Sequence, residues 1–209
     1  MSKVGKKFPD ISVNAMNEMG DTFKINVLQE ALENKKKIIL FWYPKDFTFV
    51  CPTEIHAFQS KLSEFEKRNT MVIGASCDTP EVHFAWLSTP KDNGGIEGVT
   101  FPLIADSTRH LSETLDILDT EYVGTEENYS IEGDNVSYRA TFLIDEEGTM
   151  FHESVNVKPL GRNVDEYLRL IDGYAHNQKH GEVCPANWEE GKEAMSESRE
   201  SVANYLSKH

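Results

Sequence analysis

The apolar run KIILFWY, at residues 37–43, constrains the fold more than any other feature of the sequence. After its first lysine it carries no charge, and it is rich in β-branched and aromatic residues, as is typical of a strand buried on both faces. Two more apolar segments, at 71–76 and 101–106, predict further buried strands. Helical patterns follow the three strands, at 51–67, 80–88 and 109–118. Strands that alternate with helices in this way predict a sheet flanked by helices.

The second half of the chain adds a β-hairpin and a longer helix. Two strand patterns, YRATFLID at 138–145 and TMFHESVN at 149–156, flank the turn EEG. Asn163, with Glu166 three residues later, resembles a capping box and opens a helix that we expect to end near residue 177. Since a hairpin adds antiparallel strands, the sequence predicts an α/β fold with a mixed β-sheet.

The composition disfavours several classes of protein. The net charge of −14 opposes binding to a nucleic-acid backbone. No run approaches the ~20 apolar residues of a membrane span, and the N-terminal segment lacks the apolar region of a secretory signal. The three cysteines are too few and too far apart for a disulfide scaffold. They include no C-x-x-C pair, which disfavours a zinc site and a thioredoxin motif. We therefore expect a cytoplasmic protein that binds neither nucleic acid nor membrane and holds no metal.

The character of the chain changes at Gly181. Residues 181–209 are polar and rich in Glu and Ser, and their few large apolar side chains cannot form a core alone. We therefore divide the chain into a main domain, 1–180, and a C-terminal extension arm, 181–209. The arm carries Cys184, and we expect it to cover its own domain or a partner subunit.

Cys51 stands at the junction between the first buried strand and the helix that follows it. Pro44 ends the strand, and Pro52 suits the first turn of a helix, where a missing N–H costs nothing. Thiols react as thiolates, and helix N-termini and nearby cations stabilise a thiolate. The position alone allows two interpretations, a reactive thiol or a buried small apolar residue, because free cysteine is often buried.

Three polar residues could serve the Cys51 thiol. Thr48 offers a hydroxyl that can donate and accept hydrogen bonds one turn before the sulfur. Glu54 would oppose a thiolate, so we expect it to hold a cation instead. Arg139 opens a buried strand, and we interpret it as a guanidinium that stabilises the thiolate and is oriented by Glu54. The alternative for Arg139 is an ordinary surface charge.

The spacing Pro44-x-x-x-Thr48-x-x-Cys51 matches the P-x-x-x-T-x-x-C signature of peroxiredoxins. Around it, FTFVCPTE resembles the form found in typical two-cysteine peroxiredoxins of the alkyl hydroperoxide reductase C / thiol-specific antioxidant group. HFAW, YRATFLID and GEVCPANW resemble further segments of that family, in the same order. The likeness covers most of residues 4–190.

The resemblance implies a thioredoxin-like fold and a peroxidase cycle. Cys51 would attack hydrogen peroxide or an organic hydroperoxide and become a sulfenic acid. Thr48 and Arg139 would hold the peroxide oxygens and the thiolate, and Pro44 would shield the sulfenic acid. Cys184 of the partner subunit would then condense with the sulfenic acid to form an intersubunit disulfide.

The resemblance also implies partners but no cofactor. Members of the family form homodimers, and five dimers can assemble into a decamer. A thioredoxin-like protein or a flavoprotein disulfide reductase would restore the thiols. Two other functions stay open: a ring-forming holdase or scaffold without turnover, which the intact site residues disfavour, and a protein disulfide oxidoreductase, which the missing C-x-x-C pair disfavours.

Three segments depart from the family pattern. Many relatives carry a G-G-L-G stretch and a C-terminal Tyr-Phe pair, which slow local unfolding of the active-site helix and so permit overoxidation. Here Gly94-Gly95-Ile96-Glu97 and Tyr205-Leu206 replace them, and we predict moderate rather than high sensitivity to overoxidation. The acidic segment 119–135 is longer than expected, and we interpret it as an exposed loop or hairpin without an assigned role.

The remaining cysteine and two histidines are interpreted as structural. Cys77 ends a buried strand, which favours a packed thiol. His83 is expected to be packed or to lie at an interface. His56 stands five residues after Cys51, and positions i and i+5 of a helix diverge, which argues against a metal-binding pair.

Overall fold

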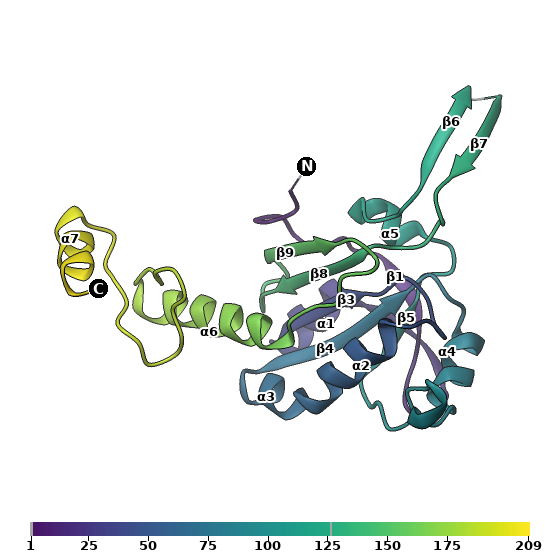
Figure 1. Cartoon of the computed structure of the whole chain (residues 1–209), viewed down its shortest axis with the longest axis horizontal. Coiled ribbons are helices and arrows are strands. Elements are labelled where there is room, and N and C mark those ends of the chain that lie inside the picture. The colour runs from purple at the N-terminus through teal and green to yellow at the C-terminus, as the bar shows by residue number, and fades with distance from the viewer. Residues whose placement is uncertain (1, 126) are drawn as a thin grey trace. The chain divides into compact units, whose positions relative to one another are not determined.

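The computed structural model describes residues 2–125 and 127–209 (Figure 1). The chain divides into two compact units, residues 1–162 and 163–209. The strands of the first unit are β1 (Ser12–Met16), β2 (Thr22–Asn26), β3 (Lys37–Trp42), β4 (Thr70–Ser76), β5 (Leu103–Ala105), β6 (Glu121–Thr125), β7 (Asn128–Glu132), β8 (Arg139–Ile144) and β9 (Met150–Asn156). Its helices are α1 (Val27–Asn34), α2 (Cys51–Ser60), α3 (Leu62–Lys67), α4 (Pro80–Leu87) and α5 (His110–Leu115). The second unit contains α6 (Val164–His180) and α7 (Arg199–Lys208).

Seven strands of the first unit form one sheet in the order β2-β1-β5-β4-β3-β8-β9. β4 runs parallel to both β3 and β5, whereas the other neighbouring strands are antiparallel. The predicted mixed sheet is therefore confirmed. β3 lies between β4 and β8, and every residue of β3 after Lys37 is buried, which explains why the run is apolar.

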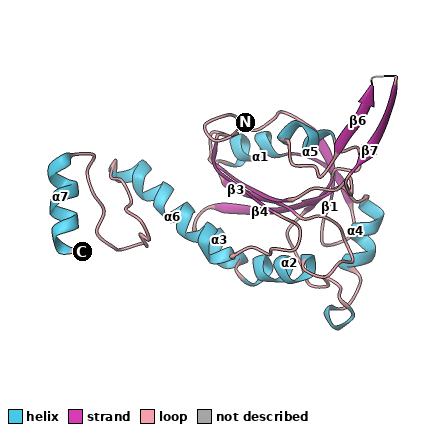
Figure 2. Ribbon diagram, turned by 45° about the horizontal axis from the view of Figure 1, so that its top comes forward, coloured by secondary structure: helices cyan, strands magenta, loops and turns pink. Residues whose placement is uncertain are grey.

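Helices cover both faces of this sheet (Figure 2). Successive side chains of a strand point to opposite faces, so β3 contributes to two cores. Leu40 and Trp42 belong to the core that includes side chains of α1 and α5. On the other face Phe41 stacks on Phe58 of α2, with 4.0 Å between ring centroids. The predicted α/β fold class is confirmed.

Some elements differ from the predicted boundaries. The helix expected at 51–67 is divided into α2 and α3 at Lys61, where the backbone leaves the helical region (φ −105°, ψ 7°). The helix expected at 109–118 ends at Leu115, because Asp116 adopts a left-handed conformation (φ 60°). The strand expected at 101–106 is shortened to β5. No prediction covers β1, β2 and α1, which bury only one to three residues each.

The acidic segment 119–135 forms the antiparallel pair β6–β7, which projects from the rest of the first unit (Figure 1). Its described strand residues are exposed. Tyr122 and Tyr129 pack edge to face on it, with 5.6 Å between ring centroids. The expected exposed hairpin is confirmed, except that Glu126 lies outside the described residues.

The second unit is built around α6. Asn163 caps this helix by accepting a hydrogen bond from the Asp165 amide, and the helix continues to His180 before Gly181 (φ 66°) ends it. The arm that follows contains a single bridge between Val183 and Met195 and one buried tryptophan, Trp188. The compact unit thus includes α6 as well as the arm, and the division of function at residue 180 stays a prediction.

Within residues 2–125 and 127–209, none of the helices has the length and apolar character that crossing a bilayer requires.

Candidate active site

Cys51 is the first residue of α2, and its side chain is fully buried. The amides of Thr53 and Glu54 both donate to the Val50 carbonyl, at 3.1 and 3.3 Å, which closes the first helical turn at the cysteine. Pro52 lies in that turn, as predicted. The positive end of the helix dipole therefore lies at the Cys51 thiol, where it favours the thiolate.

Thr48 lies in the loop between β3 and α2 and contacts the sulfur directly. Its Oγ1 is 2.9 Å from the Cys51 Sγ and 2.8 Å from the Lys45 carbonyl oxygen. A hydroxyl has one proton, so Thr48 can donate to only one of these acceptors at a time. Donation to the carbonyl would leave the hydroxyl oxygen available as an acceptor beside the sulfur.

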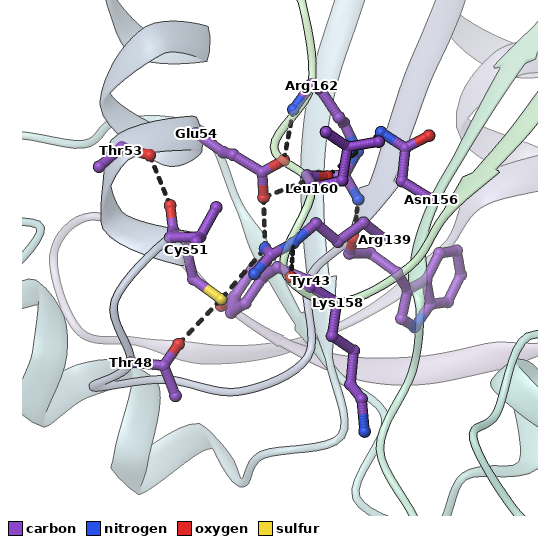
Figure 3. A network of polar contacts seen from close by, with 12 residues as sticks. Tyr43, Thr48, Cys51, Thr53, Glu54, Arg139, Asn156, Lys158, Leu160 and Arg162 are labelled. Carbon is purple, nitrogen blue, oxygen red and sulfur yellow. Dashed lines mark hydrogen bonds and ion pairs between the residues drawn. The ribbon is translucent and has the colours of Figure 1, made fainter.

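Arg139 is the first residue of β8 and is 4% exposed, so the surface-charge alternative is wrong. Its Nη1 donates to Glu54 Oε2 at 2.6 Å and to Cys51 Sγ at 3.4 Å. Its Nε donates to the Lys158 carbonyl at 2.6 Å. Figure 3 shows Thr48 and Arg139 reaching the sulfur from different sides. The predicted contacts of Arg139 with Glu54 and Cys51 are therefore present.

Glu54 also binds a residue that sequence reasoning missed, Arg162. Glu54 Oε1 accepts the Arg162 backbone amide at 2.9 Å, and Oε2 forms an ion pair with the Arg162 guanidinium at 3.3 Å (Figure 3). Arg162 Nη2 also donates to the carbonyls of Trp42 and Ala140. The only local signal for Arg162 was an arginine directly before the helix cap Asn163, which does not reveal a partner 108 residues away.

Opposite charges are buried together in this cluster beside the Cys51 sulfur. The side chains of Arg139 and Arg162 are 4% and 0% exposed, and that of Glu54 is 3% exposed. Glu54 pairs with both guanidiniums, and the Arg139 guanidinium also donates to the Cys51 sulfur. A cation held next to a cysteine sulfur favours its nucleophilic form.

A cavity of about 600 Å³ gives access to this cluster. Its wall includes Thr48 and Arg139, the two side chains that hydrogen-bond the Cys51 sulfur. Other parts of the wall are apolar and come from Pro44, Phe49, Val50, Val136 and Pro159. The cavity thus combines polar groups at the sulfur with apolar surface further out, and Pro44 is buried in that wall.

Cys184 lies in the second unit, in the arm after α6, and is partly exposed. Its Sγ is 3.6 Å from the Gly173 carbonyl of α6. Burial raises the pKa of the Cys184 thiol above its usual range, and the charge of Arg169 opposes that rise. At neutral pH this cysteine is a thiol rather than a thiolate.

The residues interpreted as structural are packed. Burial raises the pKa of the Cys77 thiol, which lies 3.6 Å from the Ser112 hydroxyl. His83 is fully buried, and burial lowers its pKa. Its 2.7 Å hydrogen bond to Asp46, the Asp46 charge and the hydrogen bond to the Ile104 carbonyl act in the opposite direction, and the net shift is upward. His56 Nε2 lies 3.0 Å from the Gly95 carbonyl. In the described part of the chain, no cluster of His, Cys, Asp and Glu could hold a metal ion.

A buried thiol that is hydrogen-bonded by Thr48 and Arg139 on an α/β scaffold is typical of enzymes that use a cysteine as the nucleophile. Comparison with known protein families identifies which family of such enzymes this chain belongs to. The model of the AhpC/TSA family matches residues 4–152, and that of the C-terminal domain of 1-Cys peroxiredoxin matches residues 174–208. The chain belongs to the AhpC/TSA family.

Individual relatives extend over the whole chain. Alkyl hydroperoxide reductase C of Helicobacter pylori is 41% identical over 206 residues, which cover 99% of this chain and 96% of that protein. Peroxiredoxin-2 of Macaca fascicularis is 38% identical and covers 100% and 97% of the two chains. The reduced 2-Cys peroxiredoxin of Plasmodium vivax matches in structure with a TM-score of 0.88 and 40% identity, over 99% of this chain and 100% of that chain. The thioredoxin-like peroxiredoxin fold is thereby confirmed.

Proposed function

We propose that Cys51 is the nucleophile with which this protein reduces hydrogen peroxide and organic hydroperoxides. Membership of the AhpC/TSA family makes the chain a thiol-dependent peroxidase. The observation that carries the assignment to Cys51 is its position between the Thr48 hydroxyl and the Arg139 guanidinium, at 2.9 and 3.4 Å from the sulfur. The apolar part of the cavity wall suits the organic portion of a hydroperoxide.

The first step is attack of the Cys51 thiolate on one peroxide oxygen. A sulfur–oxygen bond forms, the oxygen–oxygen bond breaks, and sulfur loses two electrons to give a sulfenic acid. The other oxygen leaves as hydroxide or alkoxide and takes up a proton to become water or an alcohol. Arg139 offers positive charge where negative charge develops, and Thr48 can hydrogen-bond a peroxide oxygen. Pro44, in the cavity wall, keeps water and further oxidant from the sulfenic acid.

Cys184 of the partner subunit then acts as the resolving cysteine. Its sulfur attacks the sulfenic sulfur, a disulfide forms, and water leaves. The polar surroundings and partial exposure of Cys184 support this role, since a resolving thiol must move to reach its target. A thioredoxin-like protein or a flavoprotein disulfide reductase supplies the two electrons that restore both thiols.

The assembly is a homodimer, and five dimers form a decamer. Support for edge-to-edge pairing of two subunits comes from β9, which is an edge strand of the sheet and has Val155 51% exposed. Residues 1–180 form the peroxidase domain, and the arm 181–209 carries the resolving cysteine and oligomer contacts. A location in the cytoplasm stays a prediction.

Peroxide consumption coupled to a thioredoxin system tests the two cysteine roles. Wild type is compared with Cys51→Ser and Cys184→Ser, and Cys77→Ser is the matched control that removes a packed thiol. We expect Cys51→Ser to abolish turnover and Cys77→Ser to retain it. The peroxidase assignment fails if Cys51→Ser remains active.

Non-reducing gel electrophoresis separates the two roles. Peroxide should convert the wild-type protein to a covalent dimer that is absent from both the Cys51→Ser and the Cys184→Ser variants. A dimer that persists in Cys184→Ser would show that another thiol resolves the sulfenic acid.

A further inference from the structure

Arg139 depends on a second anchor besides Glu54. Its Nη1 serves both Glu54 and the Cys51 sulfur, whereas its Nε donates to the backbone carbonyl of Lys158 at 2.6 Å. A guanidinium is a rigid plane, so fixing its Nε edge and one Nη group sets the direction of the whole fork. The position of the Lys158 carbonyl therefore decides where Arg139 points relative to the sulfur.

The backbone at Lys158 belongs to a turn that has little apolar packing. It follows β9 and is closed by a hydrogen bond from the Leu160 amide to the Val157 carbonyl. The side chains of Val157 and Leu160 are 59% and 58% exposed, so they contribute little burial. This turn must therefore be stabilised largely by polar contacts.

The Lys158 side chain supplies such contacts through the base of the β6–β7 hairpin. Its Nζ lies 2.5 Å from Asp119 Oδ2 and also pairs with Asp134. Figure 3 shows the side chain leading away from Arg139. Hydrogen bonds to the two carboxylates raise the pKa of the Lys158 ammonium, and the bond to Lys158 lowers the pKa of Asp119. Lys158 and Asp119 therefore form a charged pair at neutral pH.

Asp119 is itself held in place by two hydrogen bonds. The Asp119 amide donates to the Val136 carbonyl at 2.8 Å, and the Tyr138 hydroxyl donates to Asp119 Oδ1 at 2.9 Å. Tyr138 directly precedes Arg139 at the start of β8. The hairpin base, the turn after β9 and the start of β8 thus form one connected network.

A different role for Lys158 would be to attract anionic hydroperoxides, since it lines the cavity. Its charge is overcompensated, however, because two carboxylates contact one ammonium and leave a net charge of −1 at that part of the wall. Such a group does not favour an anionic substrate. The contacts favour a positioning role instead.

We propose that Lys158 is a positioning residue, clamped by Asp119 and Asp134 so that its carbonyl directs the Arg139 guanidinium to the Cys51 sulfur. The acidic hairpin thereby acts on the reaction without touching the substrate. This inference rests on the proposed role of Cys51 as the peroxide nucleophile.

The test compares Lys158→Met and the double variant Asp119→Asn/Asp134→Asn with wild type. The matched control is Glu121→Gln/Glu132→Gln, which removes the same two charges from a cross-strand pair of the same hairpin. The rate constant for reaction with hydrogen peroxide, measured by stopped flow, should fall roughly 10-fold in Lys158→Met and in the double variant, together called the clamp variants. The reason is that small misplacements of catalytic groups cost large factors in rate. The control and Lys158→Arg, which keeps the ion pairs, should stay close to wild type.

A second readout separates positioning from loss of structure. The rate of Cys51 alkylation by iodoacetamide, followed by peptide mass spectrometry, should reach its midpoint at higher pH in the clamp variants, because a misdirected Arg139 stabilises the thiolate less. If the double variant does not fold, Asp134→Asn alone, at a carboxylate whose side chain is 69% exposed, takes its place. Peroxide rates and alkylation profiles equal to those of the charge-matched control would overturn the proposal.

The peroxidase function and the positioning role of Lys158 can be tested separately. A wild-type protein that does not consume peroxide would contradict the proposed function, and the alkylation profile would still test whether Lys158 positions Arg139. An active wild type with unaffected clamp variants would contradict only the positioning role of Lys158.

Discussion

Cys51 is fully buried and lies among charged side chains from two distant parts of the first unit, whereas Cys184 is partly exposed and has one weak backbone contact in the second. The Arg139 guanidinium donates to the Cys51 sulfur, while burial raises the pKa of Cys184 and keeps it protonated. This difference supports the proposed roles, in which Cys51 reacts first in a fixed geometry and Cys184 reacts only once Cys51 has become a sulfenic acid.

The largest effect should come from removing the fork of Arg139. Arg139→Lys keeps the positive charge but cannot contact Glu54, Cys51 and the Lys158 carbonyl together. We expect the rate constant for reaction with hydrogen peroxide to fall roughly 100-fold, the usual scale for loss of a preorganised charge-stabilising donor. Stopped-flow measurement with Arg68→Lys as the surface control checks this. An unchanged rate would mean that charge alone, without the fork, activates Cys51.

Glu54→Gln should destabilise the folded protein at the Cys51 site. It leaves the buried guanidiniums of Arg139 and Arg162 without their carboxylate, and removing one partner of a buried ion pair commonly costs about 3 kcal/mol. The free energy of unfolding, measured with urea by tryptophan fluorescence, should fall accordingly. Glu64→Gln, which removes an exposed carboxylate paired with Lys67 and Arg68, should leave the midpoint unchanged. Equal midpoints for both variants would contradict the role of Glu54 as the buried partner of the two guanidiniums.

The smallest effect concerns Cys184, the partly exposed cysteine of the second unit. The pKa of Cys184 is raised above the ordinary value of 9.0. Its thiolate fraction should therefore still increase with pH in the alkaline range in which an unperturbed cysteine is already fully ionised. In the Cys51→Ser variant, the rate of alkylation of Cys184, followed in its peptide by mass spectrometry, should therefore keep rising in that alkaline range. Arg169→Gln should move the profile further upward, since the Arg169 charge opposes the shift. A profile that is already flat at pH 8 would show that Cys184 is an activated thiol as well.

The central strands and the local motif could be predicted from the sequence, because their signals lie within a few residues. β3 is buried on both faces and therefore apolar without interruption, and Thr48 and Cys51 are three residues apart on one turn. The pairing of Glu54 with Arg139 was also predictable, because a buried carboxylate and a charged residue at the start of a core strand each need a partner. In these cases the residue types alone indicate that the position is buried and what it must contact.

Contacts between distant segments could not be predicted in the same way. Arg162 reaches Glu54 across 108 residues, and Lys158 reaches Asp119 across 39. Both residues lie in the short segment 157–163, whose sequence resembles that of any exposed loop. Their roles depend on how β9 returns to the sheet beside β8, which no local pattern specifies. The hairpin that carries Asp119 and Asp134 was expected to be exposed, but its link to the site became visible only with the fold.

The most direct test of the account is to map the disulfide formed by one turnover of peroxide. Subunits labelled with ¹⁵N and unlabelled subunits are unfolded together in reductant, refolded, and treated with stoichiometric hydrogen peroxide before digestion and mass spectrometry. We predict a Cys51–Cys184 peptide pair in which one half is ¹⁵N-labelled and the other is not. Linked pairs of uniform isotope alone, or peroxide consumption without any Cys51–Cys184 link, would contradict the division of roles between the two cysteines.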